Sequence, residues 1–269
     1  MSPALLTTKL YIPPGRPDHV ARPRLTQILD QGWQQHKKLT LVSAAAGYGK
    51  TTLVTTWLRS LGAKSAWLSL DEGDNDPIRF IAYLIAALAQ IDERVGANTR
   101  PMLGSPQPLP PELVLTSLVN EVAVVSDPFI LVLDDYHVIQ AMPVHRQLEF
   151  LVEHQPPHMH LVLITREDPP LPLARLRARS QMIEIRQADL RFSPQECTEF
   201  LGRVMGLELS PQDIAALERR TEGWIAGLQL AALSMQGCDD LPGFIQTFSG
   251  SNYYVLEYLI SEVFAQQPA

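Results

Sequence analysis

Short apolar runs alternate with amphipathic segments over the first 190 residues of the chain. The apolar runs are bounded by polar or turn-forming residues, as is typical of strands that are buried on both faces. They lie at 39–43, 66–70, 129–135, 161–165 and 183–185. Segments with helical spacing lie before and between them, at 25–35, in a run that ends at 61, and at 78–91, 112–126, 144–153 and 173–179. This alternation predicts an α/β fold with a mostly parallel sheet flanked by helices.

The pattern changes near residue 192, and the rest of the chain is predicted to be helical. Ser193 and Ser210 each begin a Ser-Pro-Gln sequence that is followed by an acidic residue. In such a sequence the hydroxyl caps a helix and the proline occupies its first position. Two further helices are expected at 223–235 and 253–264. The sequence therefore predicts that a smaller all-helical domain follows the α/β domain.

The composition indicates a soluble, ordered domain. Of the 269 residues, 46% are hydrophobic and 19% are charged, which favours a packed core over disorder. The net charge of −7 argues against this segment wrapping a nucleic acid, because that task needs a dense basic face. The longest apolar run, 80–89, is far shorter than a membrane span, and the N-terminus lacks a signal-peptide pattern. We expect a cytoplasmic protein without membrane contact.

The strongest motif is the sequence AAAGYGKT at 44–51, between an apolar strand and a helix. It matches the phosphate-binding pattern G-x-x-x-x-G-K-[ST], except that Ala44 replaces the first glycine and should therefore have a negative φ. Such a loop turns its backbone amides toward a polyphosphate, and the next helix adds its positive end. Lys50 is expected to neutralise the β- and γ-phosphates, and Thr51 to bind Mg²⁺. The expected nucleotide-binding residues of this loop are Ala46, Gly47, Tyr48, Gly49, Lys50, Thr51 and Thr52.

A second acidic motif completes the expected site. The strand FILVLDD ends in Asp134 and Asp135, and ligands of open α/β sheets bind outside the carboxyl ends of the strands. Asp134 is expected to hold Mg²⁺, and Asp135 to orient or deprotonate an attacking water. A simple turn or helix cap is the alternative for this pair.

The spacing of the two motifs favours the ATPase-type layout of the sheet. The 84 residues from Lys50 to Asp134 include one further strand and two helices, and the strand at 161–166 is expected to lie between the two motif-bearing strands. Arg166, at its tip, is then the candidate sensor of the γ-phosphate, with a surface arginine as the alternative. The sequence contains no Asn-Lys-x-Asp guanine signature, so adenine is preferred as the base.

With these motifs in order, the chain resembles the N-terminal ATPase module of the MalT-like, ATP-dependent LuxR-family transcriptional regulators, which are STAND-class P-loop NTPases. The resemblance spans nearly the whole chain. It rests on the sequences TTKLYIPP, SAAAGYGKTTL, WLSLDEGDNDPIRFIAYLIAAL, LVLDDYHVI, LITREDPPLPLARLRAR and TEGWIAGLQLAAL.

The resemblance implies several site assignments and domain limits. It places the segment around Arg22 against the adenine, and it implies catalytic roles for Lys50, Asp135 and Arg166. Related ATPases often have a proline near the base where this chain has Gln229. The expected divisions are a nucleotide-contacting segment at 1–24, the P-loop domain at 25–192, the helical domain at 193–250 and the start of a winged-helix-like domain at 251–269.

The resemblance also implies a function: an ATP/ADP-binding switch with slow, Mg²⁺-dependent hydrolysis that controls self-association of the full-length protein. DNA would be bound only by a C-terminal domain that these residues do not include. Two other functions stay open at this point. A P-loop kinase would need an acceptor pocket and a mobile lid, and a nucleotide-binding scaffold would not hydrolyse ATP at all.

Three further groups of residues invite ligand assignments. The histidines at 154, 158 and 160 could suggest zinc, but a solvated turn is the preferred interpretation. Asp71, Asp74 and Asp76 resemble a calcium loop without its last glutamate, so we expect them to cap the next helix. His137 could orient a water or pair with Asp135, or it could make a structural hydrogen bond.

Overall fold

The computed structural model describes residues 5–15, 18–105, 109–236, 240–248 and 258. The chain divides into two compact units. The first comprises Met1–Pro14, Thr26–Ser43 and Leu53–Ile185, and the second comprises Gly15–Leu25, Ala44–Thr52 and Arg186–Ala269. No helix among the described residues is long and apolar enough to cross a lipid bilayer.

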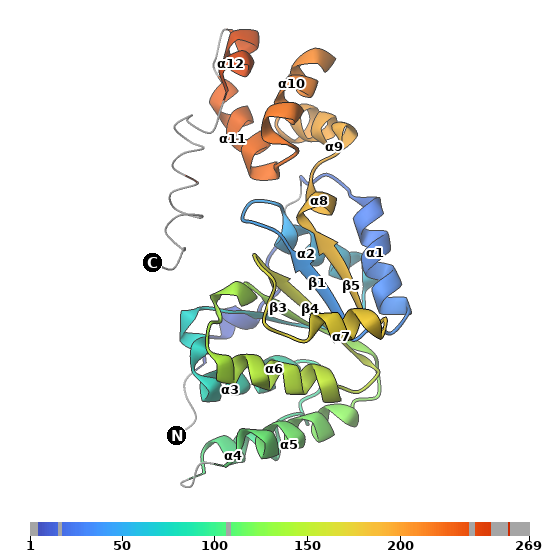
Figure 1. Ribbon diagram of the computed structural model, residues 1–269, viewed down its shortest axis with the longest axis vertical. Coiled ribbons are helices and arrows are strands. Elements are labelled where there is room, and N and C mark those ends of the chain that lie inside the picture. Colours follow the sequence, from blue (N-terminus) through green and yellow to red (C-terminus); the bar gives the residue numbers. More distant parts are fainter. Residues whose placement is uncertain (1–4, 16–17, 106–108, 237–239, 249–257, 259–269) are drawn as a thin grey trace. The chain divides into compact units, whose positions relative to one another are not determined.

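The first unit contains a five-stranded sheet in the order β2-β3-β4-β1-β5 (Figure 1). The strands are β1 (Leu39–Ser43), β2 (Lys64–Ser69), β3 (Phe129–Asp134), β4 (Met159–Thr165) and β5 (Met182–Arg186). The pairs β1–β4, β3–β4 and β2–β3 are parallel. All residues of β1, β3 and β4 are buried, as expected for central strands that are covered on both faces.

Helices cover both faces of this sheet. Residues of α3, α5 and α6 share one core with the sheet, while Trp57 of α2 donates a hydrogen bond to Asp30 of α1 at 2.8 Å and ties these two helices together. In Figure 1, α3 and α6 lie beside the sheet, with α4 and α5 beyond them. The helices up to β5 are α1 (Pro23–Gln34), α2 (Lys50–Leu61), α3 (Pro77–Leu88), α4 (Thr99–Leu103), α5 (Pro111–Ala123), α6 (Met142–His154) and α7 (Leu173–Ala178).

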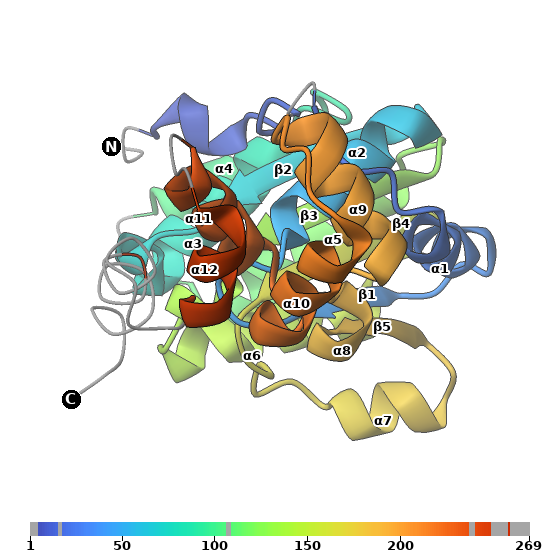
Figure 2. The same ribbon diagram turned by 90° about the horizontal axis from the view of Figure 1, so that it is seen from above.

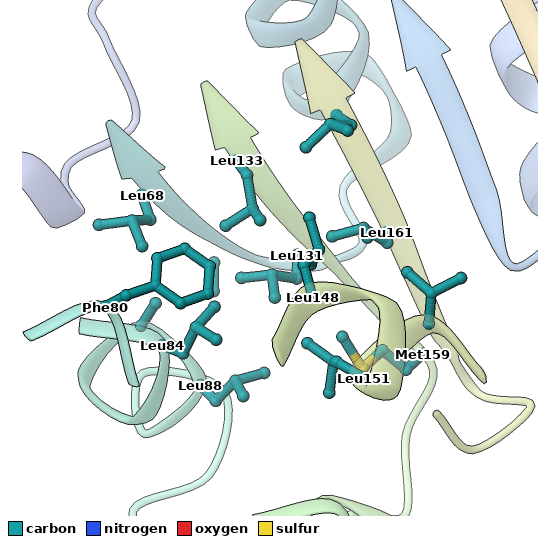
Figure 3. Packing of buried hydrophobic residues seen from close by; sticks show 14 of the residues in the cluster. Leu68, Phe80, Leu84, Leu88, Leu131, Leu133, Leu148, Leu151, Met159 and Leu161 are labelled. Atoms are coloured by element: carbon teal, nitrogen blue, oxygen red, sulfur yellow. The ribbon is translucent and has the colours of Figure 1, made fainter. Parts of the chain in front are cut away.

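The core of the first unit is built mainly from aliphatic side chains, together with the buried rings of Phe80, Tyr83, Phe129 and Tyr136. Alternate residues of the strands point to the same face of the sheet and meet the apolar stripes of α3 and α6. Figure 3 shows this packing for Leu68, Leu131, Leu133, Met159 and Leu161 of the sheet and for Phe80, Leu84, Leu88, Leu148 and Leu151 of the helices. Burial of each of these side chains contributes roughly 1.5–3 kcal/mol.

The second unit is mainly helical and has a core of its own. Its helices are α8 (Gln187–Leu190), α9 (Pro194–Glu199), the π-helical turn η4 (Phe200–Val204), α10 (Pro211–Thr221), α11 (Ile225–Met235) and α12 (Leu241–Thr247). Helix α10 contacts α9, α11 and α12, and α10–α12 lie together in Figures 1 and 2. The core residues are Val20, Phe192, Cys197, Phe200, Leu201, Leu217, Leu228, Ala231, Ala232, Met235, Ile245 and Phe248.

The predicted element order is confirmed, including the strand between the two motif-bearing strands. Ser193 and Ser210 cap α9 and α10 as expected, and Asp76 caps α3 by accepting from the amides of Ile78 and Arg79. No helix was expected between the segments at 78–91 and 112–126, but this stretch contains α4, whose N-terminal side is fixed by hydrogen bonds to Glu121.

The predicted domain limits at 24, 192 and 250 remain predictions. The helix expected at 253–264 and the further domain expected at 251–269 lie outside the described residues, apart from Tyr258.

His160, at the start of β4, is a buried titratable group outside the expected site. Its Nδ1 is 2.6 Å from the carbonyl oxygen of Lys37 and must donate, so Nε2 accepts from the Thr40 hydroxyl at 2.8 Å. Only 2% of the residue is exposed, and burial lowers its pKa to about 4. The ring is therefore neutral in the folded chain at neutral pH.

We expect this histidine to make the stability of the chain depend on pH between about 6.5 and 4. In that window the unfolded chain binds a proton at His160 and the folded chain does not, so the free energy of unfolding falls as the pH falls. The loss is about 3 kcal/mol at pH 4, and it should shrink in His160→Asn. Urea unfolding at pH 7, 5.5 and 4 measures it, with the exposed His154→Asn as control. An unchanged pH dependence in His160→Asn would contradict this assignment.

Candidate functional site

The glycine-rich loop at 44–52 lies in the second unit and has the backbone conformation that the motif requires. Gly47 and Gly49 have φ values of +79° and +72°, which residues with a Cβ rarely adopt. Ala44 is not among the described non-glycine residues with positive φ, as the sequence predicted. The loop follows β1 in the chain, and its last three residues, 50–52, form the first turn of α2.

The Lys50 ammonium group lies against the first part of its own loop. It donates to the carbonyl oxygens of Ala44 at 2.8 Å and Ala45 at 2.9 Å, and only 8% of the residue is exposed. The lysine thus joins the last part of the loop to the first part. Its positive charge lies beside the carbonyls of Ala44 and Ala45. The next residue, Thr51, lies in the first turn of α2 and carries a side-chain hydroxyl oxygen.

The start of α11 packs against the outer side of this loop. The indole Nε1 of Trp224 donates to the Ala46 carbonyl at 3.0 Å, and the Ala226 amide donates to the Gly47 carbonyl at 3.0 Å. Trp224 also contacts the ring of Tyr258, with the ring centroids 5.7 Å apart. Nothing in the sequence indicated this contact of Trp224, because periodicity cannot reveal a bond to a loop 178 residues away.

Gln187 and Arg191 of the second unit also contact the loop, and no sequence signal pointed to either residue. Gln187 accepts a hydrogen bond from the Ala45 amide at 3.3 Å through its side-chain oxygen. Tyr48 is buried and hydrogen-bonded to Arg191, and burial raises the pKa of its hydroxyl. These contacts add to the backbone turns that fix the shape of the loop.

Arg22 is buried within the second unit by a network around Glu196. Its Nη2 donates to the carbonyls of Leu190 and Arg191, both at 2.9 Å, and its Nε lies 3.3 Å from a Glu196 carboxylate oxygen. The guanidinium stacks over Phe192 at 5.0 Å, and burial lowers its pKa. Its Nη1, which carries two N–H donors, is buried without a hydrogen-bond partner among the described residues. Contact with a nucleotide base remains a prediction.

Asp134 lies in the first unit, at the last position of β3. It is paired with Ser69 of β2, and its carbonyl accepts from the Leu70 amide at 3.0 Å. Its carboxylate accepts from the Asp135 amide at 3.0 Å, and only 4% of the residue is exposed. Because β1, β4 and β3 are parallel, the C-terminal residues Ser43, Thr165 and Asp134 lie at the same edge of the sheet.

The next residue, Asp135, has a strained backbone. Its φ and ψ are 57° and 37°, the left-handed region, at a cost of roughly 1–3 kcal/mol for a residue with a side chain. Its side chain is 51% exposed, and Oδ1 lies 3.9 Å from Nδ1 of His137. His36, Ser180 and Glu222 also have positive φ, so Asp135 is singled out by its position directly after β3 together with this backbone, and not by the backbone alone.

Arg166 follows Thr165, the last residue of β4, and is partly buried. The Thr165 hydroxyl donates to the Glu167 carbonyl at 2.9 Å, and this bond restrains the backbone that follows the strand. The predicted position of Arg166, at the tip of the strand between β3 and β1, is confirmed by the strand order. Its role as a γ-phosphate sensor remains a prediction.

The donor groups fit magnesium better than a metal that prefers nitrogen or sulfur. A threonine hydroxyl at Thr51 and a carboxylate at Asp134 are oxygen ligands, and Mg²⁺ commonly binds through one or two of these plus phosphate oxygens. Among the residues that the structure describes, no group of three or more His, Cys, Asp or Glu side chains could hold a metal. The expected solvated turn is wrong for His160, which is buried in β4 and bonded to Thr40 and to the Lys37 carbonyl.

The strand order, the glycine turns before α2 and the acidic end of β3 together define a P-loop ATPase fold. The model of the AAA ATPase domain family matches residues 13–164, more than half of the chain. The chain belongs to this family.

Two curated relatives extend the similarity beyond that segment. The chain is 35% identical over 261 residues to the HTH-type transcriptional regulator MalT of Cronobacter sakazakii, covering 96% of this chain and 29% of that protein. It is 33% identical over 247 residues to the serine/threonine-protein kinase PknK of Mycobacterium tuberculosis, covering 91% of this chain and 22% of that protein. The resemblance to the ATPase module of MalT-like regulators is thereby confirmed. The chain spans less than a third of either relative.

A solved structure supports the fold independently of close sequence similarity. A Walker-type ATPase of Pyrococcus abyssi superimposes with a TM-score of 0.56 at 14% identity, covering 86% of this chain and 72% of that protein. At this level of identity the likeness concerns the fold alone.

We expect Gly47→Ala to destabilise the chain more than Gly206→Ala. Both glycines have positive φ, so both substitutions carry the left-handed cost of about 1–2 kcal/mol. A Cβ at Gly47 would lie 2.5 Å from Ala226 Cβ and 2.7 Å from Trp224 Nε1, whereas no described atom lies within 4 Å of one at Gly206. This overlap should add about 1–3 kcal/mol. Urea unfolding followed by circular dichroism measures the difference, and equal losses would show that α11 does not pack on the loop as described.

Proposed function

We propose that the chain is the ATP- and ADP-binding switch module of a MalT-like transcriptional regulator, with slow, Mg²⁺-dependent ATP hydrolysis. The observation that carries this proposal is the loop at 44–52, with its two left-handed glycines and Lys50 at the start of α2. This conformation serves to bind a polyphosphate through backbone amides. The family match and the carboxylate at the end of β3 support it.

In this proposal the chain's own residues divide the work of hydrolysis. The backbone of Ala46–Thr52 and the Lys50 ammonium hold the phosphates, and Arg22 contributes a donor toward the adenine. Asp135 orients or deprotonates the attacking water, and Arg166 contacts the γ-phosphate. Thr51 and Asp134 would hold Mg²⁺, which would supply positive charge to offset the charge that develops on the phosphate oxygens. Positioning and charge stabilisation thus account for the reaction, without a covalent intermediate.

The two relatives support a switch rather than a kinase. One is named as a transcriptional regulator and the other as a protein kinase, yet both share the segment that matches this chain. A segment common to both is not expected to supply either DNA binding or protein phosphorylation. Nucleotide binding is the property that such a module can contribute to both, and the net charge of −7 agrees with DNA binding residing elsewhere.

The regulatory part of the proposal concerns the full-length protein. ADP would favour a closed state, and ATP an open state able to self-associate, with DNA bound by a C-terminal domain in the cytoplasm. A difference of roughly 1–3 kcal/mol between the affinities for the two states is enough for such coupling. Sedimentation of the full-length protein with ATP or ADP would test this step. Equal association states in the two nucleotides would contradict it.

We expect Lys50→Ala to abolish measurable ATP binding. The substitution removes a buried positive charge next to the expected phosphates, which should lower the affinity on the order of 100-fold or more. Isothermal titration calorimetry with ATP and Mg²⁺ measures the change. Lys64→Ala is the matched control, because this lysine is exposed and pairs with the exposed carboxylate of Asp127 at 2.8 Å. Normal affinity in Lys50→Ala would refute the nucleotide site.

Asp134→Ala should keep some nucleotide binding while losing Mg²⁺-dependent turnover. The loop at 44–52 is unchanged in this variant, but a ligand of the metal is removed, so phosphate release should fall on the order of 100-fold. Single-turnover hydrolysis of labelled ATP, with and without Mg²⁺, provides the measurement. Asp127→Ala, which removes an exposed carboxylate, is the control. Unchanged turnover in Asp134→Ala would show that this carboxylate does not serve the reaction, and absent turnover in the unaltered chain would favour a scaffold.

A further inference from the structure

The strained residue Asp135 is followed by a loop that a distant side chain holds in place. After Asp135 the chain makes the short helix η3 (Tyr136–Val138) and then reaches the start of α6 at Met142. Within the loop the Val138 amide donates to the Asp135 carbonyl at 3.1 Å. A left-handed backbone at a residue with a Cβ persists only where its surroundings enforce it. The contacts of this loop therefore decide whether Asp135 keeps its conformation.

The side chain of Asn75 provides the main contacts from outside the loop. Its Nδ2 donates to the Val138 carbonyl at 2.9 Å and to the Glu72 carbonyl at 3.0 Å. Its Oδ1 accepts from the amides of Gln140 at 2.7 Å and Ala141 at 2.8 Å. All four hydrogen-bonding positions of the amide are thus used. The Asn75 side chain thus joins the segment that follows β2 to residues 138–141, which lead from η3 to α6.

The segment that carries Asn75 is itself firmly held within the first unit. It forms the short helix η2 (Glu72–Asn75), in which Asp71 and Asp74 form a reciprocal capping box. Asp74 is fully buried, with one oxygen bonded to Lys9 and the other accepting from Arg79 Nε at 3.1 Å. A rigid base of this kind allows Asn75 to fix the position of the loop it contacts.

We propose that Asn75 is a positioning residue for ATP hydrolysis, which holds Asp135 in the left-handed conformation through the loop at 136–141. This inference rests on the proposed function, in which Asp135 acts on the attacking water. Asn75 itself touches neither water nor nucleotide in this proposal. Without its amide, two carbonyls lose their donor and two amides lose their acceptor, and Asp135 can relax toward the ordinary right-handed region.

The expected effect is a loss of turnover at nearly unchanged nucleotide affinity. Asn75→Ala and Asn75→Asp should each lower the single-turnover rate of ATP hydrolysis about tenfold or more, because a misplaced general base loses most of its contribution. The dissociation constant for ATP should change less than about threefold, since no residue at 44–52 is altered. A purely structural role would instead move thermal stability and affinity together.

Two control variants separate this effect from general damage. Gln140→Ala keeps the backbone amide that bonds to Asn75 and removes only an exposed side chain, so its rate should equal that of the unaltered chain. Asn98→Ala removes an exposed asparagine whose side chain does not cap α4. If Asn75→Ala fails to fold, Asn75→Asp, which keeps the size and the acceptor, decides the question.

A double-mutant cycle tests the route of the effect. Ala141 has a φ of −75°, which proline adopts, so Ala141→Pro removes the amide donor to Asn75 while keeping that residue's φ. If both residues act through this hydrogen bond, the double variant Asn75→Ala/Ala141→Pro should be little slower than Asn75→Ala alone. If the fold-reductions in rate of the two single variants instead multiply in the double variant, the two residues do not act through this hydrogen bond.

The outcomes for Asn75 and for the proposed function are distinguishable. If the unaltered chain binds no ATP or shows no Mg²⁺-dependent hydrolysis, the proposed function fails, and the positioning role fails with it. If the unaltered chain hydrolyses ATP and both Asn75 variants match its rate, only the positioning role is overturned. A tenfold slower rate with unchanged affinity, and with both controls at the normal rate, supports it.

Discussion

The parallel pairing of β1, β4 and β3 is the constraint on which the rest of the first unit depends. Parallel strands cannot be joined by tight turns, so each crossover passes through a helix, and every strand ends at the same edge. The register then brings Ser43 and Thr165 opposite each other, with Asp134 on the next strand. A one-residue shift would move every side chain of a strand to the opposite face, where it would no longer fit the side chains packed there.

At this edge and in the glycine-rich loop, the candidate site contains backbone conformations that are not intrinsically favoured. Gly47 and Gly49 reach positive φ because they lack a Cβ, whereas Asp135 adopts it with a side chain. In each case contacts distant in sequence hold the segment. Trp224 and Ala226 bond to the loop carbonyls, and Asn75 bonds to the stretch that follows Asp135. Rigid loops of this kind suit a reaction that depends on positioning more than on covalent chemistry.

Local pattern was enough to predict the architecture of the chain. The apolar runs located the five strands of the sheet. The motif spacing predicted that β4, which precedes Arg166, lies between β3 and β1. Capping signals also predicted the starts of α9 and α10 correctly. These features depend on neighbours within a few residues or on burial on both faces, which the sequence displays directly.

The contacts that complete the candidate site could not be predicted in the same way. Asn75 is separated from its partners in the next loop by 63 to 66 residues, and Arg22 from its partners by more than 160. Helix α4 was missed because its anchor, Glu121, lies on α5 and gives no local signal. A polar side chain in a turn-rich segment is compatible with many partners, so its role becomes visible only when the chain is folded.

Buried charge also explains why two of the sequences that support the family resemblance occur together. Lys9, within TTKLYIPP, is almost fully buried and pairs with Asp74 and, at 3.0 Å, with Asp71, both within WLSLDEGDNDPIRF. A buried carboxylate without its cation is strongly destabilising, so neither sequence is tolerated easily without the other. Since Asn75 directly follows Asp74, the same ion pairs that fix the N-terminal segment also fix the base from which Asn75 reaches the loop after Asp135. Two family signatures that look independent along the chain are therefore parts of one physical support for the acidic edge of the sheet.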